Sequence, residues 1–433
     1  MRKLLLWMIG VAMLTMARPS YAQLDGVFEK LFKKVLDDDL IKTGDGHGTH
    51  FRNAAAAANK NLTPALNSLI ASNISSFPLA STIAGVSYDF STGRPVPIKG
   101  SLGPIFAETA ETLGKGRINA GVGFSHLSLN RFRGIPTRDV RFTFTHRDTL
   151  QAGLGDDRFE LDLIDLNLGL NVNANIYAFF ITFGVTNSLD IGVAVPYVNV
   201  SLNGTAEALL RGPFTGRSHT FVGGTTANPK VTDSVPYDEN ASGVGDLAVR
   251  LKYSFVRSVD LNLGALLDVR LPTGKEEDFL GTGKMNTKLL LIASRKIAQF
   301  TPHLNLGYDR RTATGDSDEL EFNIGLDQKL AQGITLAMDF LGEVDVNNSE
   351  ALKFAETETV TLVDKLSPGV TINRVEDVTS IPQRDNDNTL NAAIGLRLAP
   401  SERILLLGNV LIPMNAGGLR SSVAPTLGVT VNF

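Results

Sequence analysis

Apolar and polar side chains alternate along most of the chain from about residue 116 to the carboxy terminus. Successive side chains of a β-strand point to opposite faces of the sheet, so a period of two predicts strands. The same pattern recurs in the segments 244–255, 261–271, 302–309, 320–327, 334–345 and 389–398. In the last segment one face carries Val423, Pro425, Leu427, Val429, Val431 and Phe433. The alternation therefore predicts an all-β protein with many strands.

Composition narrows the class of protein further. The 433 residues include no cysteine, which excludes a disulfide scaffold, a thiol catalyst and thiolate metal sites. A formal charge of −4 gives no support for nucleic-acid binding. The sequence has no run of about 18 apolar residues that would predict a helical membrane span. A mean hydropathy of +0.05 fits a β-barrel whose lipid face is hidden from a running average by the alternation.

The amino terminus has the pattern of a secretory signal peptide. Arg2 and Lys3 give a positive start, and an apolar run follows from Leu4 to Met16. Small residues, Ser20 and Ala22, then stand at −3 and −1 relative to Gln23. This order of segments predicts export of the chain and removal of residues 1–22.

Residues 23–115 differ from the rest of the chain and predict helical and irregular structure. Apolar residues from Val27 to Leu36 recur at three and four positions, which is the period of an amphipathic helix. A second helix is expected over 54–74, kinked at or starting from Pro64. Residues 84–90 resemble a short strand, and 91–115 a connector. We expect the whole segment to be either a plug in the lumen or a periplasmic segment.

The connections between the predicted strands alternate in length, as they do in exported barrels. Tight turns are expected at 186–188, 257–258, 298–299, 331–333 and 400–402, and long polar loops at 205–242 and 346–388. The segments 137–148 and 158–172 are interpreted as arms that continue the first strands beyond the membrane. With 116–130 and 158–185 as single arms, residues 116–433 form a transmembrane antiparallel β-barrel of 12 strands. Counting 84–90 and 137–148 separately gives the alternative of 14.

Three features favour a lipid-facing barrel over a soluble sandwich. The apolar face continues through many strands, the polar face is rich in ionisable groups, and the chain, which is expected to be exported, ends in Phe433 on the apolar face of the last strand. A terminal aromatic residue of this kind is the predicted signal for the barrel assembly machinery. The polar face carries ionisable groups of both signs, which a barrel turns inward to pair or be wetted. The predicted luminal residues are Asp246, Arg250, Lys252, Asp268, Arg270, Lys288, His303, Asp309, Glu321, Asp327, Asp339, Glu343 and Arg397.

Several motifs resemble those of a known family. They comprise 101–108 (SLGPIFAE), 114–117 (GKGR), 184–196 (GVTNSLDIGVAVP), 243–247 (GVGDL), 271–274 (LPTG) and 281–283 (GTG). Over most of residues 45–345 the chain resembles outer-membrane proteins described as "putative MetA-pathway of phenol degradation". The resemblance implies an outer-membrane pore or transporter for small aromatic or other hydrophobic compounds, without catalytic residues. Related fatty acid and aromatic hydrocarbon transporters carry an amino-terminal hatch in a 14-stranded barrel, and residues 23–115 would correspond to it.

Other motifs have simpler interpretations. The string from Asp45 to His50 contains the H-G-T-H of subtilisin-like proteases, but no partner Asp or Ser motif accompanies it. Its histidines could share a metal ion, and an exposed loop is the favoured reading. Asp339 and Glu343 are interpreted as luminal charges, with no catalytic, cofactor or metal site predicted. Phe179 and Phe183 are assigned to an aromatic girdle, whereas Phe180 points the other way and is a candidate for the lumen.

The predicted function is passive uptake of a small, hydrophobic or aromatic solute through a barrel in the bacterial outer membrane. The expected partners are outer-membrane lipid, the barrel assembly machinery and the solute itself, with no nucleic acid. Luminal charges would keep a wetted channel, and residues 23–115 would narrow or gate it. The alternative is a structural or surface-interaction barrel with no transport role, in which 205–242 and 346–388 form the contact surface.

Overall fold

The protein is described here from a computed structural model of the whole chain. The structure describes residues 23–42, 50–78, 88–89, 96–97, 102–145, 162–212, 219–225, 227–258, 261–313, 316–346, 354, 357–363 and 370–433. The predicted signal peptide lies outside these residues. So do Asp45 and His47 of the string that contains the H-G-T-H motif.

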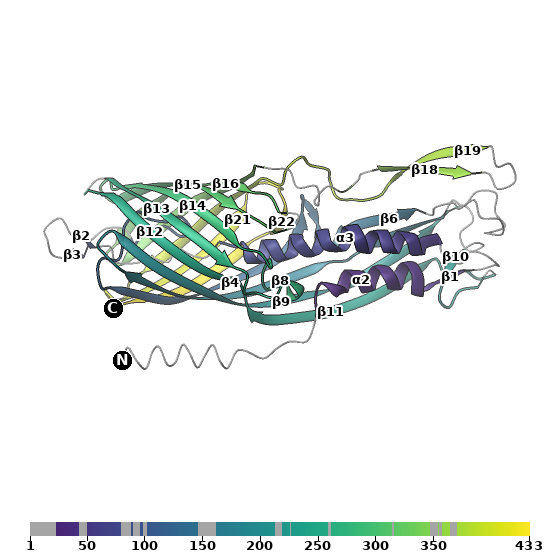
Figure 1. Ribbon diagram of the computed structural model, residues 1–433, viewed down its shortest axis with the longest axis horizontal. Coiled ribbons are helices and arrows are strands. Elements are labelled where there is room, and N and C mark those ends of the chain that lie inside the picture. Colours follow the sequence, from purple (N-terminus) through teal and green to yellow (C-terminus); the bar gives the residue numbers. More distant parts are fainter. Residues whose placement is uncertain are drawn as a thin grey trace.

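Twelve antiparallel strands close into a barrel, because the last strand pairs with the first (Figure 1). In order around the barrel they are β4 (Ile118–Phe132), β8 (Asn171–Gly184), β9 (Leu189–Arg211), β12 (Leu247–Arg257), β13 (Leu261–Leu271), β14 (Asn286–Arg295), β15 (Phe300–Arg310), β16 (Glu319–Ala331), β17 (Ile334–Asp345), β20 (Thr389–Leu398), β21 (Ile404–Pro413) and β23 (Ala424–Asn432). The backbone N–H of Phe433 donates to Ile118 O at 2.8 Å and completes the closure. The prediction of 12 strands is confirmed, and the alternative of 14 is wrong.

The alternative count fails because the extra segments do not cross the barrel. Within the part of the chain that the structure describes, residues 88–89 (β2) pair with 96–97 (β3) and with no barrel strand. The segment 137–148 holds a short helix, η2 (Thr137–Asp139), and the strand β6 (Arg141–Thr145), which pairs with β7 (Leu163–Asn167). Gly169 separates β7 from β8 at a φ of +56°, where a Cβ atom would lie 2.3 Å from Thr205 O. Only glycine fits this break between an arm and a barrel strand.

The two ends of the barrel differ, as the sequence predicts. Tight turns and the carboxy terminus share one end, here named the short-turn end, and the opposite end is named the long-loop end (Figure 1). The long segments of the long-loop end contain more regular structure than expected. Residues 205–242 are mainly the end of β9, the strand β10 (His219–Phe221) and β11 (Thr232–Val244), and residues 346–388 contain the hairpin of β18 (Thr357–Val363) and β19 (Thr371–Asp377). The remaining short strands are β1 (Leu40–Lys42), β5 (Ile135–Pro136) and β22 (Leu419–Ser421).

Two amino-terminal helices pack on the part of the sheet that extends beyond the long-loop end (Figure 1). Helix α2 (Gly26–Lys33) continues as η1 (Lys34–Asp38), and α3 (His50–Ser75) runs through Pro64 without a break. Their apolar faces meet the inner face of the strand arms, and the rings of Phe32 and Phe144 lie 5.9 Å apart. Strand β1 pairs with β10 at the far end. Burial of these faces holds the helices on the extension.

The amino-terminal segment then enters the barrel. The last residue of α3, Ser75, donates to Asp246 Oδ2 at the long-loop end, at 2.9 Å. Residues 102–113, here named the luminal arch, contact inward-facing side chains of β9, β12, β15, β17 and β20. The rings of Phe77 and Phe106 meet edge to face at 6.4 Å, so both parts of the segment lie together in the lumen.

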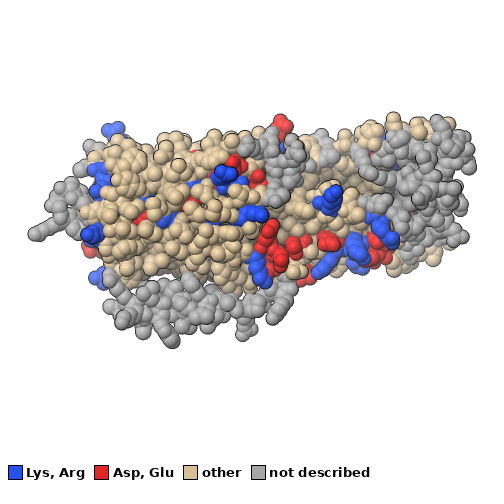
Figure 2. Space-filling view, viewed as in Figure 1, with Lys and Arg blue, Asp and Glu red and all other residues tan. Residues whose placement is uncertain are grey.

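The outer wall of the barrel is apolar. Large exposed side chains occupy alternate positions on nearly every barrel strand, among them Leu251, Tyr253, Leu267, Leu289, Leu291, Leu306, Ile324, Phe340, Ile394, Leu406 and Leu427. In Figure 2 acidic and basic side chains gather densely where the extension joins the barrel. A continuous exposed apolar wall on a closed barrel fits contact with lipid. No helix among the described residues is long and apolar enough to cross a membrane.

Candidate functional site

The residues predicted to line the lumen occupy inward positions, but their partners differ. Asp246, Arg250, Lys252, Asp268, His303, Asp309, Asp327, Asp339 and Arg397 are buried, and Arg270, Glu321, Glu343 and Phe180 are half-buried. The structure gathers them into three groups: one around the luminal arch, one at the long-loop end, and single residues that pack on the wall.

Glu108 fastens the luminal arch to the wall formed by β12 and β13. Its carboxylate lies 2.7 Å from Lys252 Nζ and 3.3 Å from an Nη1 atom of Arg250. Arg250 also holds Asp268 at 2.7 Å, so two cations and two carboxylates are neutral as a set. All four side chains are more than nine-tenths buried, and such a group is stable only when every charge has a partner.

Asp339 fastens the opposite side of the arch. Its Oδ2 atom accepts the backbone N–H groups of Ile105, Phe106 and Ala107 at 3.1, 3.0 and 3.4 Å. Its Oδ1 atom lies 2.7 Å from His303 Nε2. Gly325 leaves the space for this pair, because a Cβ there would lie 2.2 Å from each of those two atoms. A turn of backbone donors around one carboxylate gives the arch a defined conformation.

Further polar contacts close the ring of attachments. Asn305 binds Glu108 twice, accepting its N–H at 2.7 Å and donating to its carbonyl at 3.0 Å. Leu113 N donates to Asp190 Oδ2 at 2.9 Å. At the other foot of the arch, Arg397 donates to Leu102 O at 3.0 Å. The arch is therefore held by strands distributed around the barrel.

A ladder of ion pairs lies nearer the long-loop end. Lys288 Nζ is 2.5 Å from Glu321 and 3.6 Å from Asp309, and Arg311 holds Glu319 at 2.5 Å. Ligand atoms of Glu319, Glu321 and Glu343 come within 4.8 Å of one another, which is close enough to share a cation. Because Lys288 and Arg311 already neutralise two of these glutamates, the ladder is explained as paired luminal charge.

The rim of the long-loop end holds the last turns of α3. Ser72 donates to Asp316 in the loop between β15 and β16, at 2.6 Å. Burial raises the pKa of the Asp316 carboxyl, and this hydrogen bond and Arg311 oppose the shift. Asp246 accepts the backbone N–H groups of Gly274 and Thr282, both at 3.0 Å, as well as Ser75 Oγ. The predicted luminal Asp246 thus organises the rim.

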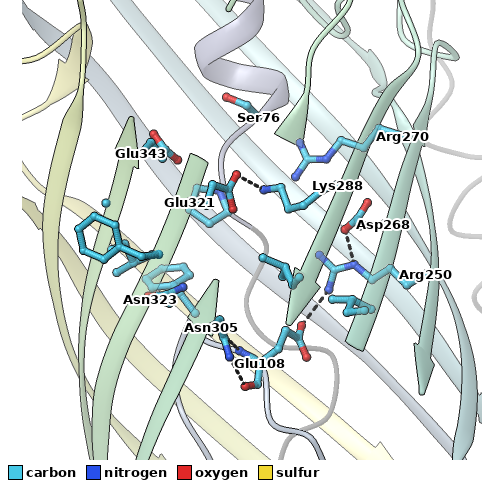
Figure 3. A pocket seen from close by; sticks show the side chains of 17 residues that line it. Ser76, Glu108, Arg250, Asp268, Arg270, Lys288, Asn305, Glu321, Asn323 and Glu343 are labelled. Atoms are coloured by element: carbon cyan, nitrogen blue, oxygen red, sulfur yellow. Dashed lines mark hydrogen bonds and ion pairs between the residues drawn. The ribbon is translucent and has the colours of Figure 1, made fainter. Parts of the chain in front are cut away.

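A cavity lies between the end of α3 and the arch (Figure 3). It contains about 680 Å³ of space free of atoms, partly open to solvent. Ser76 and Pro78 line one side, and Phe106 and Glu108 the other. Figure 3 shows Arg270 and Glu343 on opposite sides, with the Lys288–Glu321 ion pair between them. The apolar part of the wall includes Leu266, Leu290 and Leu341.

Two further cavities adjoin the same short segment of chain. One, of about 640 Å³, shares Ser76, Pro78, Leu341 and Glu343 with the first and is otherwise mainly apolar. The other, of about 340 Å³, lies between Phe77 and Arg270. Cavities therefore surround residues 74–78 at the level where the chain enters the barrel.

Some sequence predictions single out residues that take no part in these groups. Phe180 points inward, but its ring packs on the wall, since a Cβ on Gly121 would lie 2.6 Å from it. Phe433 is 39 % exposed at the short-turn end. Glu108, Asn305 and Asp190 were not predicted as site residues. Glu108 belongs to the motif 101–108, and its charge in an otherwise apolar stretch was the available signal.

Solved structures with a related arrangement have very different sequences. The COG4313 outer-membrane channel from Pseudomonas putida F1 is 12% identical, with a TM-score of 0.40, covering 75% of this chain and 98% of that chain. The P. putida toluene transporter TodX is 9% identical, with a TM-score of 0.34, covering 73% of this chain and 90% of that chain. A Pseudomonas aeruginosa FadL homologue is 9% identical, with a TM-score of 0.33, covering 73% of this chain and 90% of that chain. No curated protein matches the sequence.

The match to a protein family is more extensive. The model of the family described as "Putative MetA-pathway of phenol degradation" matches residues 149–379, more than half of the chain. The match extends past residue 345, where the resemblance noted in the sequence ends, and does not include residues 45–148. The protein therefore belongs to the family described as "Putative MetA-pathway of phenol degradation".

Proposed function

We propose that the protein is a bacterial outer-membrane channel for passive uptake of small hydrophobic or aromatic compounds. The observation that carries this proposal is the group of cavities around residues 74–78, which lies inside a closed barrel with an apolar outer wall. A solute that enters from the long-loop end meets these cavities before it reaches the arch. Lipid surrounds the wall, and the signal peptide and Phe433 direct export and assembly by the barrel assembly machinery.

Residues 23–115 act as the plug in this proposal. The arch is fastened by Glu108 and Asp339 on opposite sides, and α3 ends at the long-loop rim. Together they leave cavities rather than a wide pore. We expect no reaction and no cofactor, because most of the luminal carboxylates pair with cations or accept backbone N–H groups, which suits a passive path.

Reconstitution tests the proposal. The purified protein in planar bilayers should conduct ions, and in liposomes it should admit small aromatic and alkyl solutes. Deletion of residues 23–115 should raise the conductance if they plug the lumen, and unchanged conductance would place them outside the path. A folded barrel with neither conductance nor uptake, in both full-length and deleted forms, would favour the structural or surface-interaction barrel instead.

A further inference from the structure

The cavities share a feature that concerns the head group of the solute. Each is lined by an arginine that forms no ion pair with any described carboxylate: Arg270 in two cavities and Arg420 in the third. Every other cation around the first cavity is committed. Arg250 holds Asp268 and Glu108, and Lys288 holds Glu321. Among the described residues, the charged side chains of the first cavity that form no ion pair are therefore Arg270 and Glu343, which have opposite charges.

The Arg270 guanidinium has N–H groups that form no hydrogen bond with the described residues. Among the described residues, the Arg270 guanidinium donates one hydrogen bond, from Nη1 to the carbonyl oxygen of Ser75, the last residue of α3. A guanidinium has several N–H donors in a planar fork that matches a carboxylate. Figure 3 shows the Arg270 side chain directed from β13 toward the cavity. Arg420 differs, because its Nη atoms already donate to oxygens of Leu390, Asn391 and Asn415. It therefore contributes charge rather than free donors.

The opposite wall would orient an anion. Glu343 accepts a hydrogen bond from Thr389 at 2.7 Å, and no lysine or arginine of the described residues lies within ion-pair distance of it. Its negative charge repels an anionic head group from β17 and favours the side of Arg270. Leu266, Leu290 and Leu341 offer apolar surface elsewhere on the wall for the rest of the molecule.

From this arrangement we infer that the first cavity binds small organic carboxylates with an apolar body, with the carboxylate on Arg270. The inference rests on the proposed channel function and names the class of solute that the channel takes. An aromatic ring would pack against Leu266 and Leu290 while two parallel N–H···O bonds fix the head group. A neutral compound of the same shape would leave the guanidinium without its ligand.

Benzoate and its neutral isostere benzamide provide matched probes. Binding is measured by calorimetry on the full-length protein in detergent, and permeation from the reversal potential in a gradient of potassium benzoate across a planar bilayer. Arg270→Gln removes the charge and shortens the side chain, so the contact with Ser75 O is lost as well. We expect benzoate to bind about tenfold more weakly to this variant, since a charge-assisted hydrogen bond is lost. Benzamide should bind weakly to both proteins, and the benzoate permeability relative to potassium should fall.

Arg403→Gln, in the exposed turn at the short-turn end, is the matched control and should leave both readouts unchanged. Arg270→Lys keeps the charge without the fork, and should give an intermediate affinity. If Arg270→Gln does not fold into a heat-modifiable barrel, Arg270→Lys still tests whether benzoate binding depends on the guanidinium. Equal binding of benzoate and benzamide, or benzoate binding unaffected by either Arg270 variant, would overturn the inference. Loss of all conductance with benzoate binding intact would instead overturn the channel function and leave the binding site.

Discussion

Glu108 Oε2 lies 2.7 Å from Lys252 Nζ, although the two residues are 144 positions apart in the chain. The contact joins the amino-terminal segment to the inside of the barrel wall, and both side chains are almost fully buried. The Arg250–Asp268 pair completes the group. The position of the luminal arch therefore depends on a balance of buried charges, which single substitutions can disturb.

Glu108→Gln should destabilise the barrel and loosen the arch. Loss of the carboxylate leaves Lys252 buried without its partner, at a cost of about 3 kcal/mol in the free energy of unfolding. Urea unfolding in lipid vesicles measures this cost, and planar-bilayer recordings should show a higher conductance. Glu402→Gln, at an exposed turn, is the control. An unchanged free energy of unfolding would mean that the ion pair does not fasten the arch.

Gly325→Ala should break the second attachment. The added Cβ would lie 2.2 Å from both Asp339 Oδ1 and His303 Nε2, so their hydrogen bond cannot survive unchanged. We expect a loss of about 2 kcal/mol, as for overpacked sites. Gly123→Ala is a matched control on another barrel strand, because its Cβ would meet nothing nearer than 3.8 Å. Equal stability of the two variants would contradict the role given to Gly325.

Leu291→Arg should show that the outer wall faces lipid. Leu291 is 58 % exposed in the middle of β14, where an arginine facing hydrocarbon costs about 2–4 kcal/mol. Met285→Arg lies just before the same strand and should cost about 1 kcal/mol or less, because that depth is near the interface. Folding into vesicles measures both values. A cost that did not depend on depth would argue against a membrane-spanning wall.

Phe433→Ala should impair assembly in cells more than stability. The backbone bonds between residue 433 and Ile118, at 2.8 and 3.2 Å, need no aromatic ring, so the closed barrel itself should persist after refolding in detergent. Heat-modifiable migration of the protein in outer-membrane fractions is the measurement, with the detergent-refolded variant alongside. Normal assembly in cells would show that the ring is not read as a signal.

Asp316→Asn should stabilise the protein above acidic pH. Burial raises the pKa of Asp316 in the folded protein, so the folded state holds this proton more tightly than the unfolded chain. The ionised carboxylate therefore lowers stability at neutral pH, and the penalty disappears as the pH falls below the ordinary value of 3.8. The variant keeps an acceptor for Ser72. Its gain in thermal stability should be present at pH 7 and vanish in acid, whereas exposed Asp385→Asn should show no such difference.

Much of the fold could be predicted from local patterns. Alternation in segments such as 261–271 predicts which side chains face outward, because a strand repeats every two residues. The tight turns and the 12 strands follow from the same pattern. The long segments 205–242 and 346–388 were expected to be loops, since their polar composition conceals strands that pair beyond the membrane. There, neighbouring arms and helices supply the burial that lipid supplies elsewhere.

The candidate site was only partly predictable. The alternation of apolar and polar residues places Arg250, Asp339 and Arg397 in the lumen, but it does not show which groups these side chains contact. Their partners, Glu108 and the backbone of residues 102–107, lie in a segment without regular structure. Such contacts are long-range in sequence, and no periodic signal encodes them.

The sequence by itself determined the barrel, its two faces and its unequal ends, because these depend on side-chain alternation and turn length along each strand. Only the tertiary structure decided how the lumen is filled. Closure of the sheet brings charges from distant strands around one short segment of chain, and burial there requires each charge to find a partner. Arg270, which keeps spare donors beside an apolar wall, became visible only after those pairings were known.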